Sequence, residues 1–300
     1  MTSVTSVRKS SWEYRRDRAQ LLLFAAATLW LALASHTPVR AQGEQAAQPR
    51  AQAAPARSPR EMAPADFTSY WVSIVTEDWR WRMITPDKGD YASIPLNPEG
   101  GRMADTWDPE KDQAQGNQCR AYAAPAIMRV PGRLHIYWQD DSTLRIDTDA
   151  GTQTRTLHFV HPGDTLDGAL LHVDDLPPQT IAPSWQGYSL AEWEGLRPRP
   201  QGGQAPGENP GKGLPPEGYL KVVTTHMRPG YLRKNGVPFS AKAVLEEDFD
   251  TFTESNGDKW LVVTAIVTDP QYLAQPFITS SHFKRISDSS GWQPTPCQAK

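Results

Sequence analysis

Alternating apolar and polar positions recur along much of the chain and predict a succession of β-strands separated by turns. Residues 66–74 are rich in β-branched and aromatic side chains and open this pattern. Three more alternating runs then follow one another across short polar turns. These runs are 134–138, 144–148 and 154–160. Consecutive strands with short connections predict an antiparallel meander.

Two Asn-Gly pairs mark further turns. Asn256-Gly257 separates the apolar-rich runs 244–252 and 259–269, and this arrangement is a strong short-range signal for a β-hairpin. Asn235-Gly236 is a second candidate turn, and residues 278–284 have the composition of a final strand.

Two segments before the meander predict different elements. Residues 79–84 alternate strictly and place Trp79 and Trp81 on one face, so we expect a strand there. Asn97-Pro98 is typical of a helix start, with asparagine as the N-cap and proline at the first helical position, and predicts a short helix.

A Pro/Gly-rich segment at 196–218 interrupts the strands. It holds six prolines, six glycines and almost no apolar side chains, so it cannot build a core and is predicted to be a solvated loop. Its flanks, 184–195 and 219–227, alternate like strands and predict the two arms of one hairpin with an expanded tip.

Together these signals place the chain in the mainly β class. About ten strands in an antiparallel meander favour a lipocalin-like barrel, because closure removes exposed strand edges. A two-sheet β-sandwich is the alternative.

The N-terminal residues have the layout of a secretory signal peptide. A basic head precedes the apolar run 21–34, and small residues lead to an expected cleavage after Ala41. The apolar run is shorter than the roughly 20 residues of a spanning helix. We therefore expect a signal peptide over 1–41, a disordered Ala/Gln/Pro-rich linker over 42–63 and a single β domain over 64–300, with an uncleaved anchor as the alternative.

This layout predicts a periplasmic or secreted protein without stable membrane insertion after cleavage. The chain carries 31 Lys and Arg against 34 Asp and Glu, and six of the basic but only two of the acidic residues lie within 1–41. The remainder therefore has a net charge of about −7, which repels phosphate backbones and argues against nucleic-acid binding.

The chain has two cysteines, Cys119 and Cys297, and both lie after the leader. An oxidising compartment would allow them to pair, so we predict a disulfide that ties the C-terminal tail to the domain. Two free thiols are the alternative.

No catalytic or cofactor signature stands out. Ser189 lies in a Gly-x-Ser-x-Ala sequence, but a catalytic elbow needs a following helix, and the Pro/Gly-rich segment begins too soon for one. His158 and His161 are three apart, a spacing that places them on opposite faces of a strand, and no third metal ligand is evident. We therefore predict no catalytic residues, no metal and no cofactor.

Aromatic residues are the more suggestive feature. Trp185 and Trp193 would share one face of a strand with only small residues between them, which leaves space either for core side chains or for a ligand. Inward-facing polar side chains in a barrel need a partner or a ligand. The predicted ligand-binding residues are Trp185, Tyr188, Arg155, His226 and Trp193.

Several short segments resemble a large family of exported β-rich proteins of environmental bacteria that has no established activity. These segments are Cys119, residues 126–129, 183–189, 193–195, 231–232, 236–238, 269–272, 276–277 and Cys297. The resemblance implies export, a β-rich fold and the cysteine pair. The chain departs from the family pattern at Tyr188, where histidine is more usual, at Glu192, where arginine is more usual, and in the insertion at 196–218.

The sequence leaves three functions open. The first is a non-enzymatic binding protein of the bacterial envelope that holds a small, partly apolar molecule in the barrel. The second is a periplasmic hydrolase or isomerase in the same cavity, with His226 or an acid as base. The third is an envelope interaction module that presents the loop at 196–218 to a protein partner.

Overall fold

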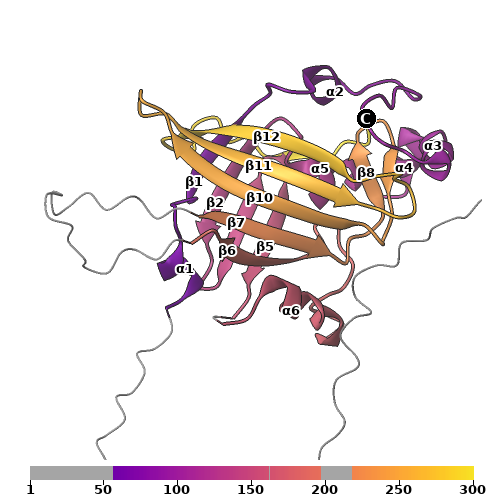
Figure 1. Ribbon diagram of the computed structural model, residues 1–300. Coiled ribbons are helices and arrows are strands. Elements are labelled where there is room, and N and C mark those ends of the chain that lie inside the picture. The colour runs from indigo at the N-terminus through magenta and orange to yellow at the C-terminus, as the bar shows by residue number, and fades with distance from the viewer. Residues whose placement is uncertain (1–56, 162, 197–217) are drawn as a thin grey trace, which may run out of the picture. The chain divides into compact units, whose positions relative to one another are not determined.

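Nine strands form a closed barrel, as predicted (Figure 1). The computed structural model describes residues 57–161, 163–196 and 218–300. In order around the barrel the strands are β1 (Ser69–Ile74), β12 (Phe277–Ile286), β11 (Lys259–Thr268), β10 (Val244–Thr253), β7 (Tyr219–Thr225), β6 (Tyr188–Glu194), β5 (Gln153–Phe159), β3 (Thr143–Thr148) and β2 (Arg133–Trp138).

Short elements surround the barrel. Two small sheets pair β4 (Ala150–Gly151) with β13 (Thr295–Pro296) and β8 (Gly230–Arg233) with β9 (Val237–Phe239). The α-helices are α1 (Pro59–Met62), α2 (Trp79–Met83), α3 (Pro98–Ala104), α4 (Pro109–Ala114), α5 (Ala124–Ile127) and α6 (Leu166–Leu170). Two 3₁₀ turns are η2 (Arg120–Tyr122) and η3 (Val173–Asp175). Within the described part of the chain, no helix is long and apolar enough to cross a membrane.

The strand pairing follows the predicted turns. The meander β2–β3–β5 and the hairpin β10–β11 are antiparallel neighbours, and Gly236 and Gly257 take positive φ angles of 84° and 89° in the two Asn-Gly turns. The arms on either side of residues 196–218 pair antiparallel as β6 and β7, while the predicted loop itself lies outside the described residues at 197–217.

Of the nine pairs around the barrel, only β5–β6 is parallel. A parallel pair needs a crossover, and residues 160–187, which include α6, make it.

Apolar side chains fill the barrel interior. Alternate residues of each strand point inward, and their large side chains pack into one core instead of lining a hollow. The inward residues that are at most 1% exposed include Trp71, Ile136, Leu144, Ile146, Leu157, Leu220, Phe249 and Phe283. A small molecule would therefore have to bind outside this packed core.

The strand predicted at residues 79–84 is wrong, because this segment forms the short helix α2. Trp79 is 65% exposed, and the most buried residue of the helix is Arg82. Five alternating residues fit one and a half helical turns as well as a strand, so the pattern could not decide between them.

The helix predicted at Asn97-Pro98 is confirmed as α3. The Asn97 side chain accepts a hydrogen bond from the Gly100 backbone nitrogen at 2.8 Å, as an N-cap should. Gly100 looks unfavourable in a helix, but a Cβ there would lie 2.3 Å from the Tyr272 carbonyl oxygen. Close packing of α3 against the loop between β11 and β12, which contains Tyr272, therefore explains the glycine.

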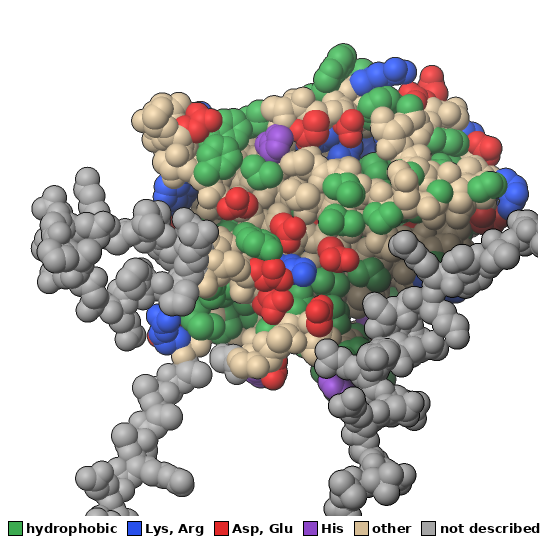
Figure 2. Space-filling view, in the orientation of Figure 1, with side chains coloured by type: hydrophobic (Ala, Val, Ile, Leu, Met, Phe, Trp, Pro, Cys, Tyr) green, Lys and Arg blue, Asp and Glu red, His purple; other side chains and the backbone are tan. Residues whose placement is uncertain are grey.

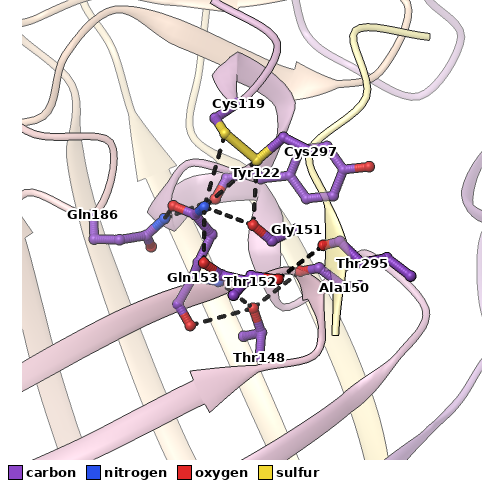
Figure 3. The surroundings of a disulfide bond; sticks show 10 residues. All are labelled: Cys119, Tyr122, Thr148, Ala150, Gly151, Thr152, Gln153, Gln186, Thr295 and Cys297. Carbon is purple, nitrogen blue, oxygen red and sulfur yellow. Dashed lines mark hydrogen bonds between the residues drawn. A yellow bond between two sulfur atoms is a disulfide. The ribbon is translucent and has the colours of Figure 1, made fainter. Parts of the chain in front are cut away.

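The predicted disulfide joins Cys119 to Cys297 (Figure 3). It links residues 178 positions apart and holds the C-terminal strand β13 beside β4. Gly151 lies beneath it with a φ of 76°, and a Cβ there would also meet the Tyr122 ring at 2.3 Å, so glycine is required on both grounds. The Gln153 side chain donates to the Gly151 carbonyl at 2.8 Å, which fixes the turn against the disulfide.

Most of the predicted signal peptide and linker lies outside the residues that the structure describes. The predicted signal peptide and residues 42–56 of the predicted linker lie outside the described residues. At the end of that linker, Ser58 and Glu61 form a capping box around α1, and the Pro59 carbonyl accepts a hydrogen bond from the Trp193 indole at 2.7 Å.

Candidate functional site

A groove of about 730 Å³ lies on the outside of the barrel, between its wall and the crossover segment. The wall side is formed by the start of β3, the end of β5 and the start of β6, and α6 and η3 form the opposite side. In Figure 1, α6 lies beside β5 and β6, below the barrel. The lining residues include Ser142, Thr143, His158, Val160, His161, Asp164, Thr165, Ala169, His172, Val173, Leu176, Tyr188 and Leu190.

His158 and Tyr188 form the aromatic floor of this groove. Their rings stack with centroids 5.0 Å apart and an angle of 19° between the planes. The alternation of β5 explains the position of His158, because Leu157 and Phe159 point into the core and His158 must point out. Tyr188 begins β6, the parallel neighbour of β5, so the two rings meet across the strand pair.

The two polar groups of this floor are available to a ligand. Among the residues that the structure describes, neither the His158 ring nitrogens nor the Tyr188 hydroxyl have a hydrogen-bond partner. Burial lowers the pKa of His158, so its imidazole is neutral at pH 7 and offers one donor and one acceptor. Burial also raises the pKa of Tyr188, so its hydroxyl stays protonated.

The crossover segment is fixed to the barrel at two points. At the start of α6, Thr165 caps the helix and the Glu192 carboxylate accepts from the Leu166 backbone nitrogen at 2.9 Å. At η3, Asp174 accepts from His226 Nε2 at a distance of 3.0 Å. Between these points, a small apolar cluster packs α6 against the outer faces of β6 and β7. It is built from Leu166, Leu190 and Val223, with Val160, Ala169, Leu170, Tyr188 and Val244 around it.

Two further histidines, His161 and His172, line the groove, and both are exposed. His172 lies 3.1 Å from Asp175 on the same segment. Across residues 57–161, 163–196 and 218–300, no group of three or more His, Cys, Asp or Glu side chains is placed to hold a metal ion. The groove lining therefore presents separate imidazoles and hydroxyls and the carboxylate of Asp164.

Arg155, one of the five predicted ligand residues, is inside the barrel and already has a partner. Its guanidinium makes two hydrogen bonds to the Glu247 carboxylate, one of them 2.9 Å long, and the two side chains are 0% and 1% exposed. The Thr224 hydroxyl lies 3.4 Å from the same guanidinium and 2.8 Å from the Ser189 hydroxyl. The sequence argument required a partner or a ligand for Arg155, and β10 supplies the partner. Ser189 is 1% exposed, so it is not presented as a nucleophile.

The two tryptophans of the predicted set do not share a face. Gly187 takes a φ of 64°, which ends the extended backbone, so β6 starts only at Tyr188. Trp193 points inward and packs against Phe159, with ring centroids 5.0 Å apart. Trp185 lies before the strand, where the Arg228 guanidinium covers its ring at 4.0 Å.

The structure thus brings together only part of the predicted set. Tyr188 lines the groove, and His226 holds η3 at its edge through Asp174. His158 is the groove residue that ligand-based sequence reasoning missed. The alternation of residues 154–160 indicates that it faces outward, but the element that would cover it, α6, had no signal of its own.

The barrel wall above α6 is acidic (Figure 2). Over β6, β7 and β10 the view shows acidic side chains gathered around a basic one. Lys221 lies 3.1 Å from Glu194, and the nearby carboxylates of Glu246 and Asp167 further raise its pKa. A negatively charged surface beside the groove favours neutral or cationic ligands over anions.

Comparisons with protein-family models, curated proteins and solved structures found no match for this chain. The resemblance to exported bacterial proteins therefore stays a prediction, and the functional conclusion rests on the geometry of the groove.

Proposed function

We propose that the protein is a non-enzymatic binding protein for a small, partly apolar molecule, and that the groove beneath α6 is its binding site. The observation that carries this proposal is the stacked pair of His158 and Tyr188, whose polar groups face the groove without hydrogen-bond partners among the described residues. A neutral imidazole and a phenol above an apolar wall are typical of a site that orients a ligand by a few hydrogen bonds.

The size and lining of the groove support a compact ligand. A volume of about 730 Å³ lies within the range of roughly 300–1,000 Å³ that small-molecule sites occupy. Val160, Ala169 and Leu190 give the groove an apolar side, and the His158–Tyr188 stack gives it a flat aromatic surface. The expected ligand is therefore a neutral or cationic molecule with a planar or apolar body and at least one hydrogen-bonding group.

The first experiment is native mass spectrometry of the purified protein, followed by titration with N-phenyl-1-naphthylamine, a neutral apolar fluorescent probe. We expect one saturable probe site, with affinity at least about tenfold weaker in His158→Ala and Tyr188→Ala, equivalent to about 1.4 kcal/mol. Phe252→Ala is the matched control, because Phe252 is an exposed aromatic at a cavity of similar size at one end of the barrel. Equal loss of binding in all three variants, or in none, would contradict the proposal.

A second candidate is catalysis in the same groove, as a hydrolase or isomerase. The observation in its favour is His226, which lies at the edge of the groove with its Nε2 on the Asp174 carboxylate, a pairing that orients a histidine for proton transfer. Its Nδ1 lies 2.9 Å from the Thr225 hydroxyl, and a substrate would have to replace that contact. Substrate turnover that disappears in His226→Ala, with the fold intact, would favour this candidate over simple binding.

A further inference from the structure

Three arginines from separate parts of the chain meet around one small cavity beneath α2. Arg82 lies on α2, Arg129 follows α5, and Arg233 ends β8. All three line a cavity of about 30 Å³, together with Lys234. This cavity is distinct from the groove beneath α6, and none of its lining residues belongs to that groove.

Two of these guanidinium groups are buried with one nitrogen unsatisfied. The Arg82 side chain is 2% exposed and donates Nε to the Arg129 carbonyl at 2.9 Å and Nη1 to Glu77. The Arg129 side chain is 9% exposed and donates Nη2 to Asp78 at 2.7 Å. Arg82 Nη2 and Arg129 Nη1 are fully buried and have no partner among the described residues.

The third arginine adds charge without a bridging carboxylate. Arg233 donates to the backbone carbonyls of Asp90 and Ala92, and its guanidinium lies 5.0 Å from the centre of the Trp81 ring. The Asp90 carboxylate instead accepts from Arg80 and from the Trp81 indole, each at 3.1 Å. The cavity therefore holds more positive charge than its neighbouring carboxylates offset.

The like charges affect one another. Burial and the nearby charge of Arg129 lower the pKa of Arg233 to about 10. Burial also lowers the pKa of Arg82, and Arg129 contributes to that effect as well. An anion between these groups would relieve the repulsion and accept the two unused hydrogen bonds, and such charge-assisted bonds are stronger than neutral ones.

We propose that this cavity is a binding site for one small anion of about the size of chloride, held by Arg82 Nη2 and Arg129 Nη1 under the field of Arg233. The volume of about 30 Å³ is more than one water molecule needs and far below that of a typical small-molecule site, which favours a compact anion such as chloride. The bound anion ties α2 to the segment that follows α5, because Arg82 belongs to this helix and Arg129 to that segment.

The test compares chloride with a large anion that cannot enter, gluconate, at constant ionic strength and with the full-length protein. Chloride at ten times its dissociation constant should raise the ratio of folded to unfolded protein about elevenfold, while gluconate should not. Chloride NMR lines should broaden in the presence of the protein, and the broadening should be lost in Arg129→Gln. Arg80→Gln is the matched control, because Arg80 lies on the same helix but is 69% exposed.

A bromide-soaked crystal of the unmodified protein tests anion binding at this site directly, so it does not depend on whether Arg129→Gln folds. An anomalous peak between the Arg82 and Arg129 guanidinium groups is the expected result. A water molecule at that position after the soak, or equal stability in chloride and gluconate, would overturn the proposal.

Discussion

The ion pair inside the barrel gives the sharpest test of the fold. Arg155 and Glu247 are 0% and 1% exposed and lie on β5 and β10, which are not adjacent strands, so the pair joins opposite parts of the wall through the core. Arg155→Met would leave the Glu247 carboxylate without the two guanidinium hydrogen bonds that satisfy it. At about 1.5–3 kcal/mol for each bond to a charged group, the lost interaction amounts to several kcal/mol.

We therefore expect Arg155→Met and Glu247→Leu each to lower the free energy of unfolding by about 3–5 kcal/mol, because each leaves a buried charge unpaired. The double variant should lie within about 2 kcal/mol of the unmodified protein, since two apolar side chains of similar volume need no partner. Thr224 keeps its hydrogen bond to Ser189 in every variant. The coupling energy from the double-mutant cycle should therefore be at least about 4 kcal/mol.

The assay is equilibrium unfolding in urea followed by tryptophan fluorescence, with equal m-values required across the variants. Lys221→Met is the control, because the Lys221–Glu194 pair is of similar length but lies on the barrel surface, and its loss should change stability by less than about 1 kcal/mol. Single variants that lose less than about 1 kcal/mol would refute the burial of the pair. Additive effects in the cycle would refute the contact itself.

Three further predictions follow from particular residues. Cys297→Ser should lower the free energy of unfolding by about 3–5 kcal/mol in urea unfolding, because it opens a loop that spans 178 residues, and a loss below about 1 kcal/mol would contradict this. Burial lowers the pKa of His158 in the folded protein. The contribution of this residue to the free energy of unfolding should therefore be fully present above the unfolded pKa of about 6.5 and be lost as the pH falls towards the folded pKa. The melting temperature of His158→Gln should accordingly depend less on pH than that of the unmodified protein. Gly236→Ala should lower the free energy of unfolding by about 2–4 kcal/mol in the same urea assay, because φ is 84° at this position and the new Cβ would lie 2.2 Å from Trp107. Gly257→Ala is the control: it has a similar φ but open space around it, so it should lose only the cost of the positive φ, about 1–2 kcal/mol.

Local signals determined the elements that depend on a few adjacent residues. The Asn-Gly turns at 235–236 and 256–257 and the N-cap at Asn97 all appear where the sequence predicts them. Each depends on backbone preferences or hydrogen bonds within about four residues, so nothing distant was needed. The two cysteines could also be paired from the sequence, because only one intramolecular pairing was possible.

Tertiary contacts decided the rest. Residues 79–83 form a helix in which Arg82 is buried and bonded to Arg129, a contact that the alternation of the segment could not indicate. The small-residue face expected between Trp185 and Trp193 is interrupted by the positive φ of Gly187, which packs against the Thr225 carbonyl.

The candidate site shows the same division most clearly. The sequence predicted Arg155 as a ligand-binding residue, but its partner is Glu247 of the same chain, 92 positions away. The sequence could place His158 on the outer face of its strand, but only the crossover between β5 and β6 brings α6 over it to form a groove. The direction in which a side chain points from a strand depends only on its position in the alternating pattern, so the sequence predicts it. The partner of a buried charge and the helix that covers a strand face come from distant segments, which meet only in the folded barrel.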